Sequence, residues 1–300
     1  MFVTRTPRLP KAGETLNGYS FSTVPGGKGA NQAVACARLG VSTAMIGRVG
    51  DDGFGKTLID TLASYHVDVS DVVTHNGVSS GVATIAVDDS AENNIIIVAG
   101  ANGTFGSDDL ARLNQRLSDA SVLLLQLEIP LEIVFAAIRT AHKHHVRVIL
   151  DPAPAVLLPD EIYPLIDVIT PNETEVALLV GFPVQNEADA VHASQVLLDR
   201  GVHDVIIKMG SKGVFWRSEK TDGSGKLYPA FQVKAVDTVA AGDAFNGGLA
   251  AALDEGYPID EAILWGLAAG ALSVTKAGAQ PSMPDRAALV AMLQQHSADR

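Results

Sequence analysis

The sequence predicts an α/β fold, a three-layer α/β/α arrangement around a mostly parallel sheet, with a small β-sheet lid beside it. From about residue 120, short apolar runs alternate with segments of helical spacing, which is the rhythm of βαβ units with right-handed crossovers. The runs 122–127 and 146–150 are almost entirely apolar, as expected of strands buried on both faces. Extended patterns at 14–24 and 81–98 predict the lid.

In the first hundred residues, one helix is expected over 29–39, where Gly40 would end it. Apolar side chains alternate along 82–86, and 95–98 is a second apolar segment, so we expect antiparallel strands joined by turn residues at 88–94. Together with the extended segment near the N-terminus they could form one small sheet. Placed over the mouth of a parallel sheet, it would act as a lid.

The second part of the chain continues the alternation of strand and helix. Residues 131–145 carry apolar side chains at helical spacing, and the strand 146–150 that follows ends at Asp151. The remaining expected strands are 168–170 and 205–209, and the remaining expected helices lie near 173–181, 186–200, 243–255, 260–276 and 285–295. The predicted organisation is therefore a core of residues 25–80 and 99–300 and a lid of residues 1–24 and 81–98.

Composition excludes several classes of function. The 300 residues are 47% hydrophobic and 19% charged, which is globular composition, with a formal net charge of -12. This acidity argues against a nucleic-acid or anionic-membrane partner, because both need gathered Lys and Arg. Cys36 is the only cysteine, so an intrachain disulfide and a thiolate metal cluster are excluded. No apolar run resembles a signal-peptide core or a membrane span, so we expect a cytosolic, cytoplasmic enzyme.

The strongest local motif is the segment 237–248, DTVAAGDAFNGG. Its small residues Ala240, Ala241 and Gly242 lead directly into a helix, where exposed N–H groups and the helix dipole would hold a transferring phosphoryl group. Asp243, in the first turn, is placed to accept a proton from an attacking hydroxyl. The alternative is an ordinary helix start in which Asp243 only complements the dipole.

A second motif is the glycine-rich segment 26–32, GGKGANQ. Its glycines let the backbone approach a ligand closely, and Lys28 and Asn31 offer polar groups of the kind that bind sugar hydroxyls. The spacing does not match a Walker A motif, so it is not a P-loop. A tight turn before a helix is the alternative.

Three further segments follow predicted strand ends, where ligands bind in open α/β sheets. Glu128 is a candidate sugar ligand or a solvated carboxylate. Asn172 and Glu175 open a helix in TPNETE, either beside a water-mediated Mg²⁺ site or as a capping pair. The Gly-bearing turn KMGSKG at 208–213 either borders a nucleotide or is only a connection.

In this order and at these separations, the five segments resemble the ribokinase family of sugar kinases, over essentially the whole chain. Two stretches add to the resemblance, DPAPA at 151–155 and GAQPS at 278–282. So does the double alanine before Gly242, where sister kinases carry Gly-Ala. The resemblance implies an ATP-dependent kinase that phosphorylates a hydroxymethyl group, with D-ribose as the expected substrate. It also implies a β lid that often pairs in a homodimer.

The same resemblance implies the roles of the residues around the sugar. Gly242 with the neighbouring amides, including those of Ala240 and Ala241, would form an anion hole, and Asp243 would deprotonate the O5 hydroxyl. The sugar pocket would be lined by Gly27, Lys28, Gly29, Ala30, Asn31 and Glu128.

Cofactor sites are implied in the same way. ATP would contact Asn172 and Gly242, and Glu175 would belong to the Mg²⁺ and phosphate network. The segment that flanks the adenine would be Lys208, Met209, Gly210, Ser211, Lys212 and Gly213. A monovalent cation, normally K⁺, is expected to order the anion-hole loop near Asp237, Val239, Ser273, Lys276, Gly278 and Ser282.

The N-terminus departs from the family's pattern. Members ordinarily begin with a buried strand carrying an Asn and an Asp, and that Asp binds the secondary hydroxyls of the sugar. Here Met1 stands about where the Asp is expected, so the first strand is absent, and its loss would expose backbone edges and apolar surface. We expect the chain as given to be a truncated form; otherwise it folds with a gap and binds sugar weakly. Leu267, where some members have a His near the adenine, is a lesser departure.

Two alternatives to a ribose kinase remain open at this stage. One is another sugar or nucleoside kinase of the same family. The other is a catalytically weak sugar- or nucleotide-binding protein. The missing strand favours this second alternative, whereas the presence of Asp243, Asn172 and Glu175 argues against it.

Overall fold

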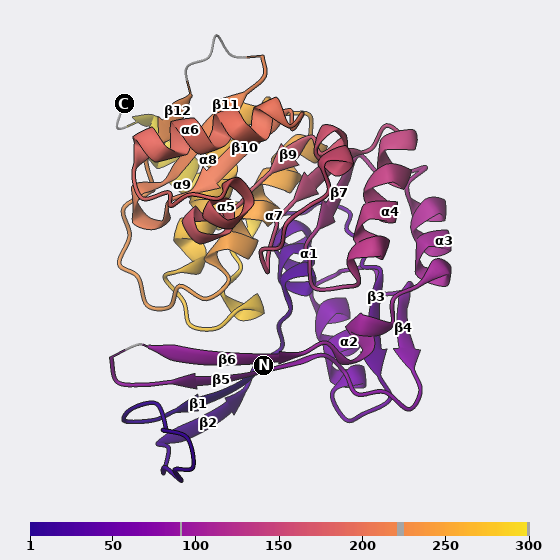
Figure 1. Cartoon of the computed structure of the whole chain (residues 1–300), viewed down its shortest axis with the longest axis vertical. Helices are drawn as coiled ribbons and strands as arrows, with labels where there is room; N and C mark the ends of the chain where they lie inside the picture. Colours follow the sequence, from indigo (N-terminus) through magenta and orange to yellow (C-terminus); the bar gives the residue numbers. More distant parts are fainter. Residues whose placement is uncertain (91, 221–224, 299–300) are drawn as a thin grey trace.

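The computed structural model describes residues 1–90, 92–220 and 225–298, which form a large α/β body and a small sheet that projects from it (Figure 1). The large body is built on a six-stranded sheet, in which β7 to β10 run parallel, β11 pairs antiparallel with β10, and β12 pairs antiparallel with β11. The prediction of a mostly parallel sheet is therefore confirmed. In spatial order the strands are β12 (Lys226–Tyr228), β11 (Val214–Ser218), β10 (Asp204–Lys208), β9 (Val168–Ile169), β8 (Arg147–Leu150) and β7 (Val122–Leu125).

Helices cover both faces of this sheet. On one face they pack against Ile149, Val168 and Ile206, and on the other against Val148, Ile169 and Val205. Neighbouring strand residues point to opposite faces, so these sets belong to two separate cores and the fold has three layers, as predicted. The first face carries α1 (Lys28–Arg38), α7 (Ala241–Asp254), α8 (Ile259–Ser273) and α9 (Arg286–Ala298), and the second carries α3 (Ser107–Arg116), α4 (Leu131–Lys143), α5 (Glu173–Val180) and α6 (Glu187–Asp199).

Shorter elements complete the large body. A parallel pair of strands, β3 (Gly47–Gly50) and β4 (Val72–His75), forms a sheet of its own, and α2 (Gly55–Ser64) connects them. The short 3₁₀ helices are η1 (Gly100–Thr104), η2 (Asp160–Leu165), η3 (Gly210–Lys212) and η4 (Gln280–Ser282). Among the helices of residues 1–90, 92–220 and 225–298, none combines the length and the apolar character that a bilayer crossing requires.

The small sheet has four strands, in the order β2 (Ser20–Thr23), β1 (Phe2–Arg5), β5 (Val82–Val87) and β6 (Asn93–Val98). The β5–β6 pair is antiparallel, as the sequence indicates, whereas β1 lies parallel to β5. Within the extended segment expected at 14–24, the strand is limited to Ser20–Thr23. The division of the chain into a core and a lid domain stays a prediction.

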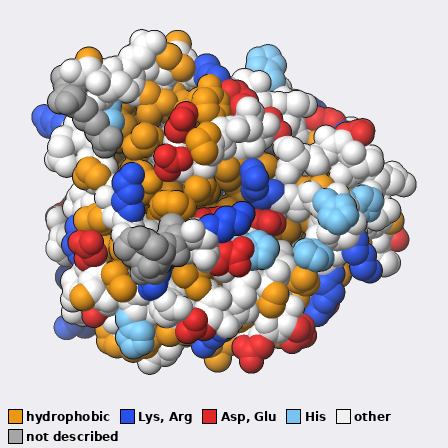
Figure 2. All heavy atoms as spheres, turned by 90° about the horizontal axis from the view of Figure 1, so that it is seen from above, with side chains coloured by type: hydrophobic (Ala, Val, Ile, Leu, Met, Phe, Trp, Pro, Cys, Tyr) orange, Lys and Arg blue, Asp and Glu red, His pale blue; other side chains and the backbone are white. Residues whose placement is uncertain are grey.

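Charged side chains are interspersed on the face seen in Figure 2, where Lys and Arg alternate with Asp and Glu around an apolar hollow. No broad basic patch gathers on this face.

The large sheet ends abruptly at β7. Its backbone bonds run towards β8, for example from Asp151 N to Leu125 O at 2.9 Å, so the groups of Val122 and Leu124 face away from β8. All four residues of β7 are only half-buried, although Val148 of β8 is fully buried. In the described part of the chain, β7 and β3 are each the edge of their own sheet.

A cavity of about 1540 Å³ lies between these two edges. It is lined by β7, by residues of β3 such as Gly47 and Val49, and by apolar side chains of the helices on both sides, among them Leu62 and Leu113. Met1 also lines it. This cavity forms a gap beside the unpaired edge of β7, where a further strand could pair.

We expect an apolar strand added ahead of Met1 to stabilise the protein. Six residues such as Val-Ile-Val-Val-Ile-Gly could pair with the free edge of β7 and bury apolar side chains, each worth about 1.5–3 kcal/mol before the entropy cost. The expected rise in Tm is about 5 °C or more, measured by calorimetry. The control is the same extension with two prolines, which cannot donate to the ladder. Equal Tm values for the two extensions would mean that the gap does not accept a strand.

Candidate active site

The N-terminus of α7 begins with an unusual backbone conformation. Ala240, the N-cap, has φ 63° and ψ 12°, a left-handed conformation that costs a non-glycine residue about 1–2 kcal/mol. Ala241 N–H bonds to Thr238 O, and the first bond within the helix is from Ala244 N to Ala240 O. The first turn of a helix leaves its N–H groups without internal acceptors, so those of Gly242 and Asp243 are placed to bind an anion.

The side chain of Asp243 is held by two amides of α1. Its Oδ2 accepts a hydrogen bond of 2.8 Å from Asn31 Nδ2, and its Oδ1 accepts one of 3.1 Å from Gln32 Nε2. The residue is 6% exposed. Burial raises the pKa of this carboxyl above its ordinary value; the charge of Lys28 works against that rise, and the charge of Asp151 adds to it. Asp243 is thus a fixed, desolvated carboxylate rather than a solvated first-turn residue.

The glycine-rich segment brings α1 to the same place. Gly27, its N-cap, has φ 104°, a conformation that L side chains rarely adopt. The backbone N–H of Lys28 donates to Glu128 Oε2 at 3.1 Å. Burial alone would lower the pKa of Lys28, but four surrounding carboxylates, Asp151, Asp243, Glu175 and Glu128, outweigh it and raise the pKa.

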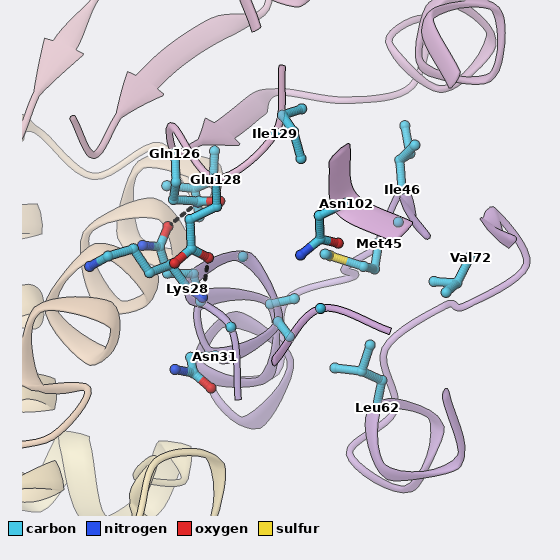
Figure 3. A pocket seen from close by; sticks show the side chains of 18 of the residues that line it. Lys28, Asn31, Met45, Ile46, Leu62, Val72, Asn102, Gln126, Glu128 and Ile129 are labelled. Atoms are coloured by element: carbon cyan, nitrogen blue, oxygen red, sulfur yellow. Dashed lines mark hydrogen bonds between the residues drawn. The ribbon is translucent and has the colours of Figure 1, made fainter. Parts of the chain in front are cut away.

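Figure 3 shows Lys28, Gln126 and Glu128 gathered on one side of the cavity, while Met45, Leu62 and Val72 line another part of it. Burial raises the pKa of Glu128, and the Lys28 backbone N–H partly counteracts the rise. All residues expected around the sugar line this one cavity, together with Asp243: Gly27, Lys28, Gly29, Ala30, Asn31 and Glu128. The polar end of the gap is therefore continuous with the candidate catalytic centre.

Asn172 and Glu175 form a capping box at the start of α5. Asn172 Oδ1 accepts from Glu175 N, and Glu175 Oε2 accepts from Asn172 N, both at 2.8 Å. The capping alternative left open by the sequence is therefore realised. Glu175 is half-buried; burial raises its pKa, and the nearby charge of Lys208 partly counteracts that rise. Cap and ligand roles are compatible in this geometry.

The segment 208–213 follows β10 and turns through η3. Met209 is buried at 2% exposed, so only its backbone is available to a ligand there. Lys212 donates to Glu173 Oε1 at 3.1 Å and to Gln185 O at 2.8 Å, which ties the turn to the start of α5. Gly210 and Ser211 are exposed, and Gly213 is buried.

The residues expected around a monovalent cation are brought together from distant parts of the chain. Asp237 accepts from Val239 N at 3.0 Å through Oδ1 and from Gly278 N at 2.9 Å through Oδ2. Ser273 and Ser282 are fully buried, and Lys276 N donates to the carbonyl of Ser273. Asp237 thus links the loop that leads into α7 to the loop after α8. A monovalent cation would bind between these two loops and order them.

Sequence reasoning did not assign a role in the site to three residues, Asp151, Gln32 and Gln126. Asp151 follows β8, is 1% exposed, and accepts from Lys208 Nζ at 2.9 Å and from Gln32 Nε2 at 3.0 Å. Gln126 donates to Gln32 Oε1 at 2.6 Å. The position of Asp151 at the carboxyl end of a parallel strand was a usable signal, whereas the bridging role of Gln32 depends on tertiary contacts.

The charges of the site suit a magnesium nucleotide. The two ammonium groups of Lys28 and Lys208 are outnumbered by four carboxyl groups, which leaves an excess of negative charge. These carboxyl groups belong to Asp151, Asp243, Glu128 and Glu175. In residues 1–90, 92–220 and 225–298, no three His, Cys, Asp or Glu side chains converge to hold a metal by themselves. Mg²⁺ usually keeps waters and binds through one or two carboxylates together with phosphates, and the half-buried Glu175 fits that mode.

Three features of the site indicate one class of enzyme. They are helix N–H groups that can bind an anion, a buried carboxylate beside them and a polar pocket in front of them. Together they are typical of a phosphotransferase that acts on an alcohol. Comparison with known proteins specifies the class. The model of the pfkB family carbohydrate kinases matches residues 1–286. The chain belongs to the pfkB family of carbohydrate kinases.

Individual relatives agree with the family. The ribokinase of Haemophilus influenzae is 44% identical over 284 residues, which cover 95% of this chain and 92% of the relative. The deoxyribokinase of Salmonella typhi is 39% identical over 283 residues, covering 94% and 92%. The solved structure of Arabidopsis thaliana ribokinase complexed with ribose and ATP has a TM-score of 0.89 at 34% identity, covering 98% of this chain and 95% of that one. The resemblance to ribokinases is therefore confirmed.

Proposed function

We propose that this chain transfers the γ-phosphoryl group of ATP to the O5 hydroxyl of D-ribose, giving ribose 5-phosphate. The observation that carries the proposal is the position of Asp243, buried at the N-terminus of α7 between two amide donors and next to Lys28. Similarity to ribokinases at 44% identity, and to a ribokinase solved with ribose and ATP, supports the choice of both substrates.

The residues of the site divide the chemistry among themselves. Asp243 accepts the proton of O5 as the O5–P bond forms and the bond from phosphorus to the ADP leaving oxygen breaks. Asn31 and Gln32 keep its two oxygens in place for that proton. The N–H groups of Gly242 and Asp243 stabilise the charge on the transferring group, while Glu128 and Lys28 bind the sugar.

Two ions accompany this proposal. Mg²⁺ would neutralise the phosphates of ATP near Glu175, with Asn172 and the segment 208–213 on the nucleotide side. K⁺ would bind close to Asp237 and Gly278, whose contact at 2.9 Å joins the two loops. By ordering the anion-hole loop, K⁺ would raise kcat without touching the substrate.

Assembly and location are part of the proposal. Ile95, Ile96, Ile97 and Val98 of β6 are each more than half exposed. An exposed apolar strand at the edge of a sheet tends to be covered by a partner, which supports a homodimer through the small sheet. A cytoplasmic location stays a prediction.

A substrate panel tests the proposed function. We expect turnover of D-ribose with ATP and Mg²⁺, at least about 10-fold above 2-deoxyribose, hexoses and nucleosides, and a several-fold fall in kcat when K⁺ is replaced by a large organic cation. Coupled ADP release measures both. A preference for 2-deoxyribose would move the assignment to the deoxyribokinase-like relatives, and ligand binding without ADP release would leave only a binding protein.

A further inference from the structure

Lys208 occupies a position that the sequence does not reveal. It is the last residue of β10, at the carboxyl edge of the sheet, and its side chain is 14% exposed. The sequence pattern places it at the head of a segment beside the adenine. Its ammonium group instead turns to the catalytic end of the site, where Nζ lies 2.9 Å from Asp151 Oδ1.

The surroundings of Gly242 show where this ammonium group lies. A methyl group added to Gly242 would lie 3.4 Å from Lys208 Nζ, which is its nearest neighbour outside the local backbone of α7. On the other side, Lys208 is the foremost charge that lowers the pKa of Glu175 against the effect of burial. Lys208 therefore stands between the anion-binding turn of α7 and the carboxylate expected near the metal nucleotide.

Asp151 has the properties of a residue that holds this lysine in place. It is 1% exposed and uses one oxygen for Lys208 and the other for Gln32 Nε2 at 3.0 Å. Lys28 Nζ is farther away, at 3.9 Å. Because Gln32 also donates to Asp243 at 3.1 Å, one amide links the anchor of Lys208 to the catalytic carboxylate.

We propose that Lys208 is a catalytic residue that donates a hydrogen bond to the transferring phosphoryl group, and that Asp151 is its positioning residue. The inference rests on the proposed function, since it assigns a further group to the same reaction. As the O5–P bond forms and the bond to the ADP oxygen breaks, the O5 proton goes to Asp243. Lys208 stays protonated and neutralises charge on a non-bridging oxygen, beside the N–H groups of Gly242 and Asp243.

The alternative is a purely structural ion pair, in which Lys208 only neutralises a buried Asp151. Breaking a buried pair on one side is costly, whereas replacing both partners can be nearly neutral. The two explanations therefore differ in the double variant. If the pair is structural, Asp151→Asn with Lys208→Met restores kcat; if Lys208 acts on the phosphoryl group, kcat stays low.

The experiment compares Lys208→Met, Asp151→Asn and the double variant, with Lys56→Met as control. Lys56 is an 84% exposed lysine of α2 that pairs only with Asp60 in the described structure. We expect Lys208→Met to lower kcat about 100-fold, with the KM for the sugar and the Kd of ADP changed less than about threefold. The double variant should remain about 100-fold down while its Tm returns towards that of the wild type.

Wild-type kcat in Lys208→Met or in the double variant would overturn the inference. If that unchanged kcat came with ADP binding weakened more than about 10-fold, Lys208 would be assigned to the adenine side. The comparison uses whichever sugar the wild type phosphorylates best. A failure of ribose alone would therefore refute the proposed substrate and leave the test of Lys208 intact, whereas an enzyme that phosphorylates no acceptor would refute both.

Discussion

Asp243→Asn is expected to lower kcat by about 1000-fold, because general-base catalysis contributes roughly 10²–10⁴-fold. The asparagine oxygen can still accept from one of the two α1 amides and the other hydrogen bond is lost, but the side chain cannot accept the proton of the attacking hydroxyl. Steady-state kinetics with ATP and the preferred sugar measure the loss. The KM for the sugar should change far less, since the side chain keeps its size and place.

The pH dependence gives a second readout for the same residue. Asp243 acts as a base only when deprotonated, and burial raises its pKa above the ordinary value. Activity of the wild type should therefore fall with decreasing pH sooner than an unperturbed aspartate would allow. In Asp243→Asn, the residual activity should lack this acid limb.

The matched control is Asp260→Asn, which removes an exposed carboxylate from the first turn of α8. If Asp243 only complemented a helix dipole, the two substitutions would have equally small effects, each about 0.3–1 kcal/mol on stability. Equal kcat values for the two variants would contradict the assignment of Asp243 as the base.

Gly242→Ala is expected to lower kcat by about 100-fold. The added methyl would lie 3.4 Å from Lys208 Nζ, in the space where an oxygen of the transferring group would meet the ammonium and the helix N–H groups. The substitution keeps the backbone N–H, but the methyl would hold that oxygen away from its donors, and losing one such donor costs about 10²–10³-fold. The backbone φ of Gly242 is compatible with alanine, so folding should be preserved, and circular dichroism checks it.

Gly106→Ala serves as the control for that substitution. Nothing lies within 4 Å of a methyl added there, and its φ of -155° is extended. It should keep both kcat and Tm close to those of the wild type. A Gly242→Ala variant as active as Gly106→Ala would mean that no phosphoryl oxygen approaches this turn.

Local sequence patterns were sufficient for the parts of the fold with strong periodicity. The strands and helices after residue 120, and the helix 29–39, were predicted within a few residues of β7 to β10, α1 and α4 to α9. Helices α2 and α3 and the strands β3, β4, β11 and β12 were not predicted. Strands β3 (GRVG), β4 (VVTH) and β12 (KLY) hold at most two adjacent apolar residues, and β11 (VFWRS) ends in two polar ones, so none continues as an apolar run like 122–127.

The candidate site could be predicted where a motif opens a helix. Asp243, Lys28 and Asn31 stand at such starts, and the structure brings them together. The pairing of Asp151 with Lys208 joins residues 57 apart, and no local pattern specifies it. For Asn172 and Glu175 the capping interpretation is confirmed, and the ligand role stays a prediction, because one carboxylate can cap a helix and still face a ligand.

The gap beside β7 shows the same division between local pattern and tertiary structure. The sequence pointed to a missing strand through the N-terminal pattern alone, with Met1 in place of an expected Asp. Only the three-dimensional arrangement locates the gap, between the edges of β3 and β7. It also shows that the gap opens to Lys28, Glu128 and Asp243, so filling it would alter the sugar pocket as well as the stability.

Phosphorus NMR of the product made from ATP and D-ribose labelled with ¹³C at C5 observes the new bond directly. A buried carboxylate next to helix amides should direct phosphorus to the hydroxymethyl oxygen, so the product phosphorus resonance should be split by coupling to C5. A sugar phosphate whose phosphorus resonance lacks that splitting, because the phosphorus is bonded elsewhere on the sugar, would contradict the account. So would the release of inorganic phosphate in place of any sugar phosphate.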